Sequence, residues 1–62
     1  MKKKELKKIA EQIVYYEKIL QNSEDSYEKH EAQEAILDLT RRVDNIDDMS
    51  FIDDYIQEYL KN

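Results

Sequence analysis

His30 is the one histidine of this 62-residue chain, and Glu31 and Glu34 lie close to it in the sequence. Histidine and carboxylate side chains three or four residues apart on a helix are typical ligands of zinc and iron. The segment 30–34 lacks the second histidine of the zinc-protease helix, and no glutamate stands three residues before His30 as in di-iron bundles. The pattern predicts no metal site here, and His30 is expected to be a solvated helix residue or a weak interface contact.

The segment from Asp44 to Asp48 gathers oxygen-bearing side chains that could attract a hard cation such as calcium. However, Ile46 stands where an oxygen ligand belongs, and the glycine that allows the tight turn of a calcium loop is missing. We therefore expect no calcium site and no bound cofactor.

Catalytic and nucleotide-binding patterns are missing as well. The chain has no glycine, which Rossmann and P-loop sites need where backbone approaches phosphate. Its serines, Ser23, Ser26 and Ser50, have no base with an orienting acid at a suitable spacing. Asp53 and Asp54 are adjacent and therefore point to different faces of a helix. These observations indicate a protein that is not an enzyme.

Apolar side chains recur at intervals of three and four residues in three segments, the spacing that places them on one face of an α-helix. The first stripe is Leu6, Ile9, Ile13, Tyr16 and Leu20, the second is Ala32, Ile36, Leu39, Val43 and Ile46, and the third is Met49, Ile52, Ile56 and Tyr59. Polar residues between the segments favour turns and caps, with Ser23 or Ser26 capping the second helix and Ser50 the third. The pattern predicts helices over about 3–21, 25–44 and 50–61 in a single domain, 1–62.

These three helices predict an all-α fold. A connection of a few residues makes the first two an antiparallel helical hairpin. If the short third helix folds back, it runs parallel to the first, and the sequence leaves open whether it packs on its own chain or on a neighbouring copy. Because the first helix is apolar over a wide arc, we expect it to lie between the other two. The expected architecture is a small three-helix bundle that self-association completes.

Several apolar residues fall outside the main stripes. They are Val14, Tyr15, Ile19, Tyr27, Leu37, Phe51 and Tyr55. Two interpretations remain open: these side chains complete the core of a monomer, or they form an interface with a second copy or with another protein. A domain of about 60 residues buries only about 60% of the surface of its unfolded chain, and this one has no cysteine for a disulfide. Self-association is therefore the expected source of additional stability.

Charge is distributed unevenly along the chain, whose formal net charge is −5. Residues 1–20 carry six lysines and three glutamates, a local charge of +3, so residues 21–62 carry −8. Acidic side chains without an intervening Lys or Arg are concentrated in one stretch: Asp44, Asp47, Asp48, Asp53, Asp54 and Glu58. This acidic surface argues against direct nucleic-acid binding and favours a basic protein partner.

The lysine-rich segment from Lys2 to Lys8 is unfavourable at the positive end of a helix dipole. In the expected bundle it lies at the same end as Asp47, Asp48 and residues 53–54. The sequence leaves two outcomes open: the aspartates compensate the lysines, or the first residues of the helix fray.

The leading hypothesis is a non-enzymatic protein–protein interaction module whose partner is a second copy or a helical or basic protein. The alternative is a small acidic inhibitor or nucleic-acid mimic, of phage or mobile-element type, that binds a basic protein groove through residues 44–58. The longest apolar run, Ile13 to Tyr16, is too short to span a bilayer, and no apolar stretch follows the first lysines as in a signal peptide. We therefore expect no membrane contact and a cytoplasmic location.

Overall fold

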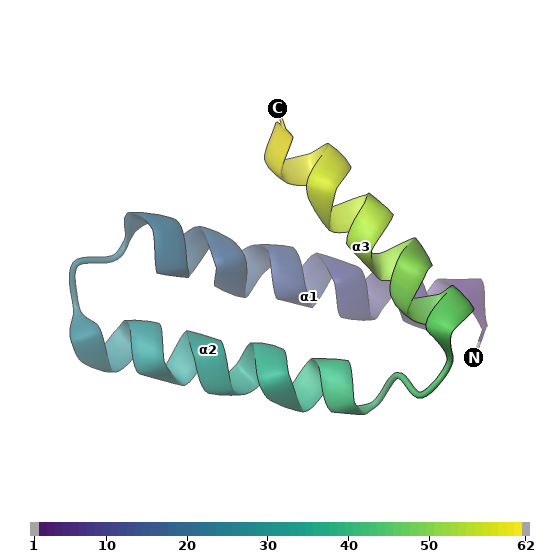
Figure 1. Cartoon of the computed structure of the whole chain (residues 1–62). Coiled ribbons are helices and arrows are strands. Elements are labelled where there is room, and N and C mark those ends of the chain that lie inside the picture. The colour runs from purple at the N-terminus through teal and green to yellow at the C-terminus, as the bar shows by residue number, and fades with distance from the viewer. Residues whose placement is uncertain (1, 62) are drawn as a thin grey trace.

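Three α-helices make up the part of the chain that the computed structural model describes, residues 2–61 (Figure 1). They are α1 (Lys3–Asn22), α2 (Ser26–Arg41) and α3 (Ile46–Lys61). The first two lie antiparallel as a hairpin, and α3 lies across α1 (Figure 1). The predicted all-α fold, a helical hairpin with a third helix, is confirmed.

Helix α1 lies at the centre of the bundle. It packs against both α2 and α3, whereas α2 and α3 make little contact with each other. Its buried side chains are Leu6, Ile9, Ala10, Ile13 and Val14. Helix α2 buries only Ala32 and Leu39, and α3 buries only Ile52. The prediction that the first helix lies between the other two is therefore confirmed.

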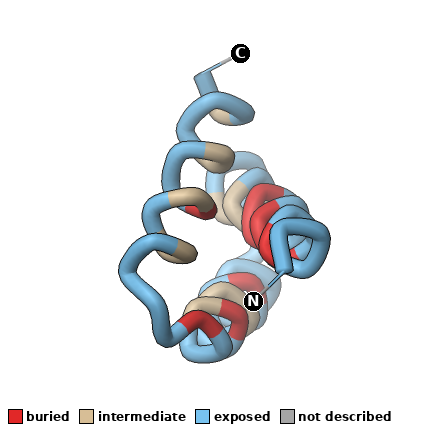
Figure 2. The backbone as a smooth tube through the Cα atoms, turned by 90° about the vertical axis from the view of Figure 1, so that its right-hand side faces the viewer, coloured by how far each residue is buried: buried red, intermediate tan, exposed pale blue. Residues whose placement is uncertain are grey.

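One hydrophobic cluster joins all three helices. Its buried members are Leu6, Ile9, Ala10, Ile13, Leu39, Val43 and Ile52. Figure 2 shows that the buried positions lie where the helices face one another. Six half-buried side chains pack around the cluster: Tyr16, Ile36, Met49, Phe51, Tyr55 and Ile56. The core is therefore small and is shared by all three helices.

Helix α3 crosses α1 obliquely and does not lie alongside it. It begins beside the N-terminal end of α1, and its C-terminal end rises away from α2 (Figures 1 and 2). The prediction that the third helix runs parallel to the first is therefore right about its direction, but α3 does not lie alongside α1. Side chains that interlock as ridges and grooves commonly make two helices cross at a large angle. Ile52 lies in the shared core, whereas Tyr59, near the far end of the same stripe, is 51% exposed.

The boundary between α2 and α3 differs from the prediction. Helix α2 ends at Arg41 and not near 44, and α3 begins at Ile46 and not at Ser50. Asn45 explains the early start, because its Oδ1 accepts a hydrogen bond of 2.8 Å from the backbone N–H of Asp47 and so caps the helix. Ile46 is consequently not part of the α2 stripe, and it is 85% exposed.

The cap of α2 also differs from the two predicted serines. Asp25 is the cap, and its Oδ1 accepts a hydrogen bond of 2.9 Å from the backbone N–H of Tyr27. Ser23 supports this turn, since its Oγ accepts a hydrogen bond of 3.2 Å from the backbone N–H of Asp25. Ser26 is instead the first residue of the helix. A carboxylate is a strong cap because it also suits the positive end of the helix dipole.

The opposite charges predicted to meet do lie at the same end of the molecule, where α1 and α3 begin (Figure 1). Yet Asp47, Asp53 and Asp54 form no ion pair with any lysine among residues 2–8. Two ion pairs lie near α2: His30 with Glu34 at 3.8 Å, and Arg42 with Asp38 at 3.4 Å. Those three aspartates therefore do not compensate the lysines by direct contact.

Candidate interaction surfaces

Four of the five tyrosines gather where α1 and α3 meet. The rings of Tyr15 and Tyr16 contact edge to face, with centroids 5.3 Å apart. Those of Tyr55 and Tyr59 stack on α3, with centroids 5.6 Å apart. Lys18 joins the two helices, because its Nζ lies 5.3 Å from the ring centroid of Tyr59. Such a contact between an ammonium and an aromatic face is attractive.

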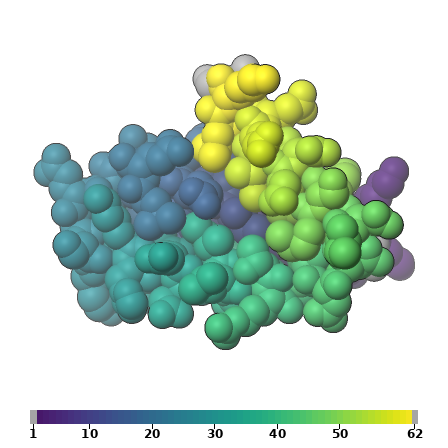
Figure 3. Space-filling model, in the orientation of Figure 1, coloured from purple at the N-terminus to yellow at the C-terminus, as the bar shows by residue number. Residues whose placement is uncertain are grey.

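Around Lys18 the surface of the molecule is hollowed in three places. One hollow, of ≈ 170 Å³, includes Glu11, Val14, Tyr15 and Tyr59 among its walls. A second, of ≈ 470 Å³, lies between the ends of α1 and α3, and a third, of ≈ 370 Å³, lies between the end of α1 and the start of α2. Lys18 lines all three. Figure 3 shows that the end of α3 stands out above the hairpin, and Tyr59 of α3 lines the first two hollows.

We call this surface the tyrosine face. It consists of the lining side chains that have the largest apolar parts: Tyr15, Lys18, Ile19, Tyr59 and Leu60. Tyr15 is 64% exposed and Tyr59 is 51% exposed, whereas Ile19 and Leu60 are half-buried. Each of these residues offers apolar atoms, and the tyrosine hydroxyls and the lysine add polar ends. The face can therefore exclude water from a contact and still form hydrogen bonds.

Tyr55 fixes α3 to α1 beside this face. Its hydroxyl donates a hydrogen bond of 3.3 Å to Oε1 of Glu11. Desolvation raises the pKa of the Tyr55 hydroxyl above its usual 10.0, and the negative charge of Glu11, together with this hydrogen bond, raises it further. The hydroxyl consequently remains a protonated donor across the physiological range.

The predicted interface residues divide into three groups in the structure. Tyr15 and Ile19 belong to the tyrosine face. Val14 is buried beneath it, and Phe51 and Tyr55 are half-buried against the core. The remaining two residues, Tyr27 and Leu37, are exposed on α2 and line none of the three hollows described above.

Sequence reasoning missed three members of the tyrosine face: Lys18, Tyr59 and Leu60. Tyr59 was assigned to the core stripe of the third helix, a position that is correct for a helix lying alongside α1. The oblique course of α3 removes this residue from the core. A possible signal was the pair Tyr55 and Tyr59, because aromatic residues four apart lie together on a helix and exceed what a small core can bury.

The predicted acidic residues lie in the connection before α3 and on the helix itself. Asp44 lies in the connection before α3, and Asp47 and Asp48 lie in the first turn of the helix. Asp54 and Glu58 line a groove. This groove has a volume of ≈ 790 Å³, and its described walls are all on α3: Phe51, Asp54, Tyr55, Gln57, Glu58, Leu60 and Lys61. We call it the α3 groove.

The outer face of α2 carries His30, Tyr27 and Leu37. The imidazole of His30 lies 3.8 Å from the carboxylate of Glu34, one turn further along. Within residues 2–61, no three His, Cys, Asp or Glu side chains lie in an arrangement that could hold a metal ion. In the same range, no helix combines the length and apolar character that crossing a bilayer requires.

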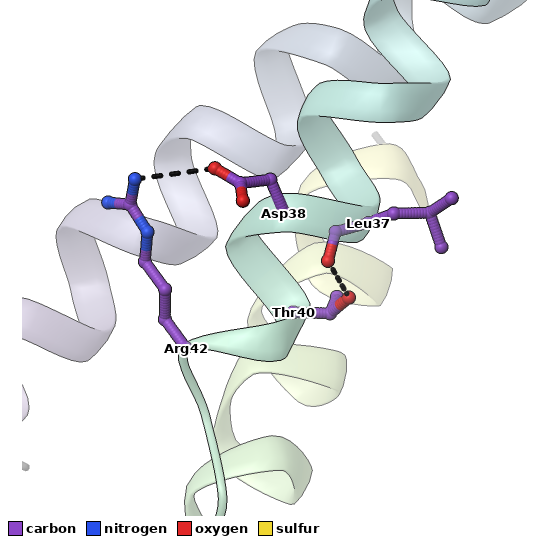
Figure 4. A network of polar contacts seen from close by, with 4 residues as sticks. All are labelled: Leu37, Asp38, Thr40 and Arg42. Carbon is purple, nitrogen blue, oxygen red and sulfur yellow. Dashed lines mark hydrogen bonds and ion pairs between the residues drawn. The ribbon is translucent and has the colours of Figure 1, made fainter.

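The last turn of α2 is held by local polar contacts (Figure 4). Arg42 pairs with Asp38, and the Thr40 hydroxyl donates a hydrogen bond of 2.9 Å to the carbonyl oxygen of Leu37. The Leu37 side chain points outward from the helix (Figure 4). These contacts stabilise the helix end and leave the apolar residue exposed.

Comparison of this chain with protein-family models, with curated proteins and with solved structures found no match in any of the three. We therefore infer function from the surfaces themselves.

Proposed function

We propose that this chain is a protein–protein interaction module without enzymatic activity, and that it associates with a second copy of itself through the tyrosine face. The supporting observation is the size of its exposed surface. The chain exposes 5032 Å², whereas a compact protein of 7.5 kDa exposes about 4,200 Å². Its radius of gyration is 11.8 Å, against about 10.6 Å for a compact domain of 62 residues.

The exposed area exceeds that of a compact protein by roughly 800 Å², which is the area that one partner contributes to a stable interface of ordinary size. The protruding end of α3 is a main source of it, because α3 packs closely only on α1. A second copy that covered the tyrosine face would bury the exposed end of α3 and give it a second neighbour. The occupant we propose is therefore another molecule of the same chain.

The chemistry of the tyrosine face suits this role. Tyrosine is enriched in interface cores, because its ring supplies a large contact area and its hydroxyl can still find a partner. A face that binds its own copy about a two-fold axis must be self-complementary, which requires both signs of charge. Glu11 and Lys18 line the same hollow and provide the two signs.

Sedimentation velocity tests this proposal over a protein concentration of about 1 μM to 1 mM, the range in which weak dimers dissociate. We expect the weight-average mass to rise toward that of a dimer. A chain that remains monomeric at every concentration contradicts the proposal.

A pair of variants locates the contact. Tyr15→Ser removes an exposed ring from the tyrosine face, and Tyr27→Ser removes an even more exposed ring, 72% against 64%, from α2. We expect Tyr15→Ser to weaken the dimer at least tenfold, a common loss for a central interface tyrosine. Tyr27→Ser should leave it unchanged. The reverse result places the interface on α2, and equal losses contradict a contact confined to the tyrosine face.

A further inference from the structure

The α3 groove has a composition unlike that of the tyrosine face. Its apolar walls are Phe51, Tyr55 and Leu60, and its carboxylates are Asp54 and Glu58. From the groove we infer that the protein has a second binding site, which takes a basic amphipathic helix of another protein. This inference differs from the proposed self-association in its partner chemistry and in its residues, apart from Leu60, which lines both surfaces.

The walls of the groove are held in place before any partner arrives. Phe51 and Tyr55 pack against the hydrophobic core with part of each ring exposed. The hydrogen bond from Tyr55 to Glu11 and its stacking on Tyr59 fix this ring further. Rigid aromatic walls lose little conformational entropy on binding, so they favour tight contact with an apolar side chain.

The carboxylates of the groove favour a cationic partner. Asp54 and Glu58 are four residues apart, so they lie one turn apart on the same side of α3. No Lys or Arg occurs between residues 43 and 60, and Lys61 is the one basic residue among the described walls of the groove, against two carboxylates. A Lys or Arg side chain can pair with a carboxylate and lie over a Phe or Tyr ring at the same time.

The length of the groove favours a helical partner. Its walls extend from residue 51 to residue 61, a distance of about 15 Å along a helix at about 1.5 Å per residue. This corresponds to three turns of a partner helix. Basic residues four apart on that helix match the spacing of Asp54 and Glu58, and an apolar residue beside them meets Phe51 or Tyr55. A nucleic acid, whose charge has the same sign as the groove, does not fit.

The test uses two synthetic helical peptides with one leucine pattern and opposite charge, one with lysine and the other with glutamate at every polar position. Fluorescence anisotropy with each labelled peptide measures its dissociation constant for the full chain. We expect the lysine peptide to bind and the glutamate peptide to bind at least tenfold more weakly. Equal binding of the two peptides, or no binding of the lysine peptide, overturns the inference.

Matched variants separate the groove from the overall negative charge of the protein. Asp54→Asn with Glu58→Gln removes two carboxylates from the groove, whereas Glu24→Gln with Glu31→Gln removes two exposed carboxylates that line neither surface. We expect the first pair to weaken binding of the lysine peptide about tenfold at low ionic strength and the second to change it less than twofold. Equal weakening by both pairs overturns the inference.

One further variant distinguishes peptide binding in the α3 groove from self-association through the tyrosine face. Tyr15→Ser alters the tyrosine face and leaves the α3 groove intact. We expect this variant to bind the lysine peptide with unchanged affinity, even where it no longer dimerises. Loss of peptide binding in Tyr15→Ser would overturn the assignment of the peptide to the α3 groove. Circular dichroism of each variant confirms that its helices are retained.

Discussion

The ammonium group of Lys18 lies 5.3 Å from the centre of the Tyr59 ring and so links α1 to α3 beyond the shared core. At this end of the bundle α3 has left α2, and α1 is its only close neighbour (Figure 1). Contacts of this kind contribute about 0.5–1 kcal/mol at exposed sites. The position of the end of α3, and with it the shape of the tyrosine face, depends on this pair and on the hydrogen bond between Tyr55 and Glu11.

The first prediction concerns this link. Lys18→Gln keeps most of the side-chain length but removes the charge, and we expect it to lower the free energy of unfolding by about 0.5 kcal/mol. The last two turns of α3 should also exchange their amide hydrogens faster, because local opening of the helix end becomes easier. Hydrogen exchange followed by NMR measures this effect. Lys29→Gln, a matched change on α2, should leave exchange in α3 unaltered, and an equal effect of both variants contradicts the prediction.

The second prediction tests the shared core. Ile52→Ala removes a fully buried side chain and should lower the free energy of unfolding by about 2–5 kcal/mol, which is a large part of the stability of so small a domain. Ile46→Ala is the matched control, since it makes the same change on the same helix at a residue that is 85% exposed. Its effect should stay within about 0.5 kcal/mol. Urea unfolding followed by circular dichroism compares the two, and similar losses would count against the core described above.

The third prediction concerns the start of α3. Asn45→Ala removes the hydrogen bond to the backbone N–H of Asp47 and should cost about 1 kcal/mol. Ser50→Ala should be neutral or slightly stabilising, because Ser50 lies within the helix, where alanine is the better helix former. The difference in urea midpoint between the two variants measures how much more the Asn45 cap contributes to stability than Ser50 does. A larger loss for Ser50→Ala would place the start of the helix where the sequence pattern alone predicts it.

The fourth prediction concerns pH. Because the pKa of Tyr55 is raised in the folded chain, the unfolded chain loses this proton first as the pH rises. The contribution of Tyr55 to stability is therefore present below about pH 10, the ordinary pKa of tyrosine, and is lost as the pH rises through the folded-state value. Tyr55→Phe should show a smaller fall in stability above pH 10 than the unaltered chain. Urea unfolding at a series of pH values, with Tyr27→Phe as the control, measures the difference.

The helices and the central place of α1 follow from the sequence because they depend on local periodicity. Leu6, Ile9 and Ile13 recur at the spacing of one helix face, and water drives any such face into contact with another. Two long apolar helices with a short connection can only form a hairpin. The wide apolar arc of α1 likewise requires neighbours on two sides. None of these conclusions depends on the exact angle between the helices.

The limits of the helices were less predictable. Ile46 has the right spacing for the α2 stripe, yet Asn45 ends that register by capping a new helix. Apolar periodicity does not reveal which of several neighbouring polar residues acts as the cap, since Asp, Asn and Ser cap helices almost equally well. The choice depends on where the chain must turn so that Val43 and Ile52 can both reach the core.

The sequence by itself determined that apolar stripes would form three helices around a small core, with charge of opposite sign near the two ends of the chain. Only the tertiary structure decided the angle at which α3 crosses α1, because that angle depends on how the side chains of both helices interlock. This angle exposes Tyr59 beside Tyr15 and buries Val14 beneath them. The surfaces from which function is proposed are therefore consequences of packing between helices, which no single stripe of residues specifies.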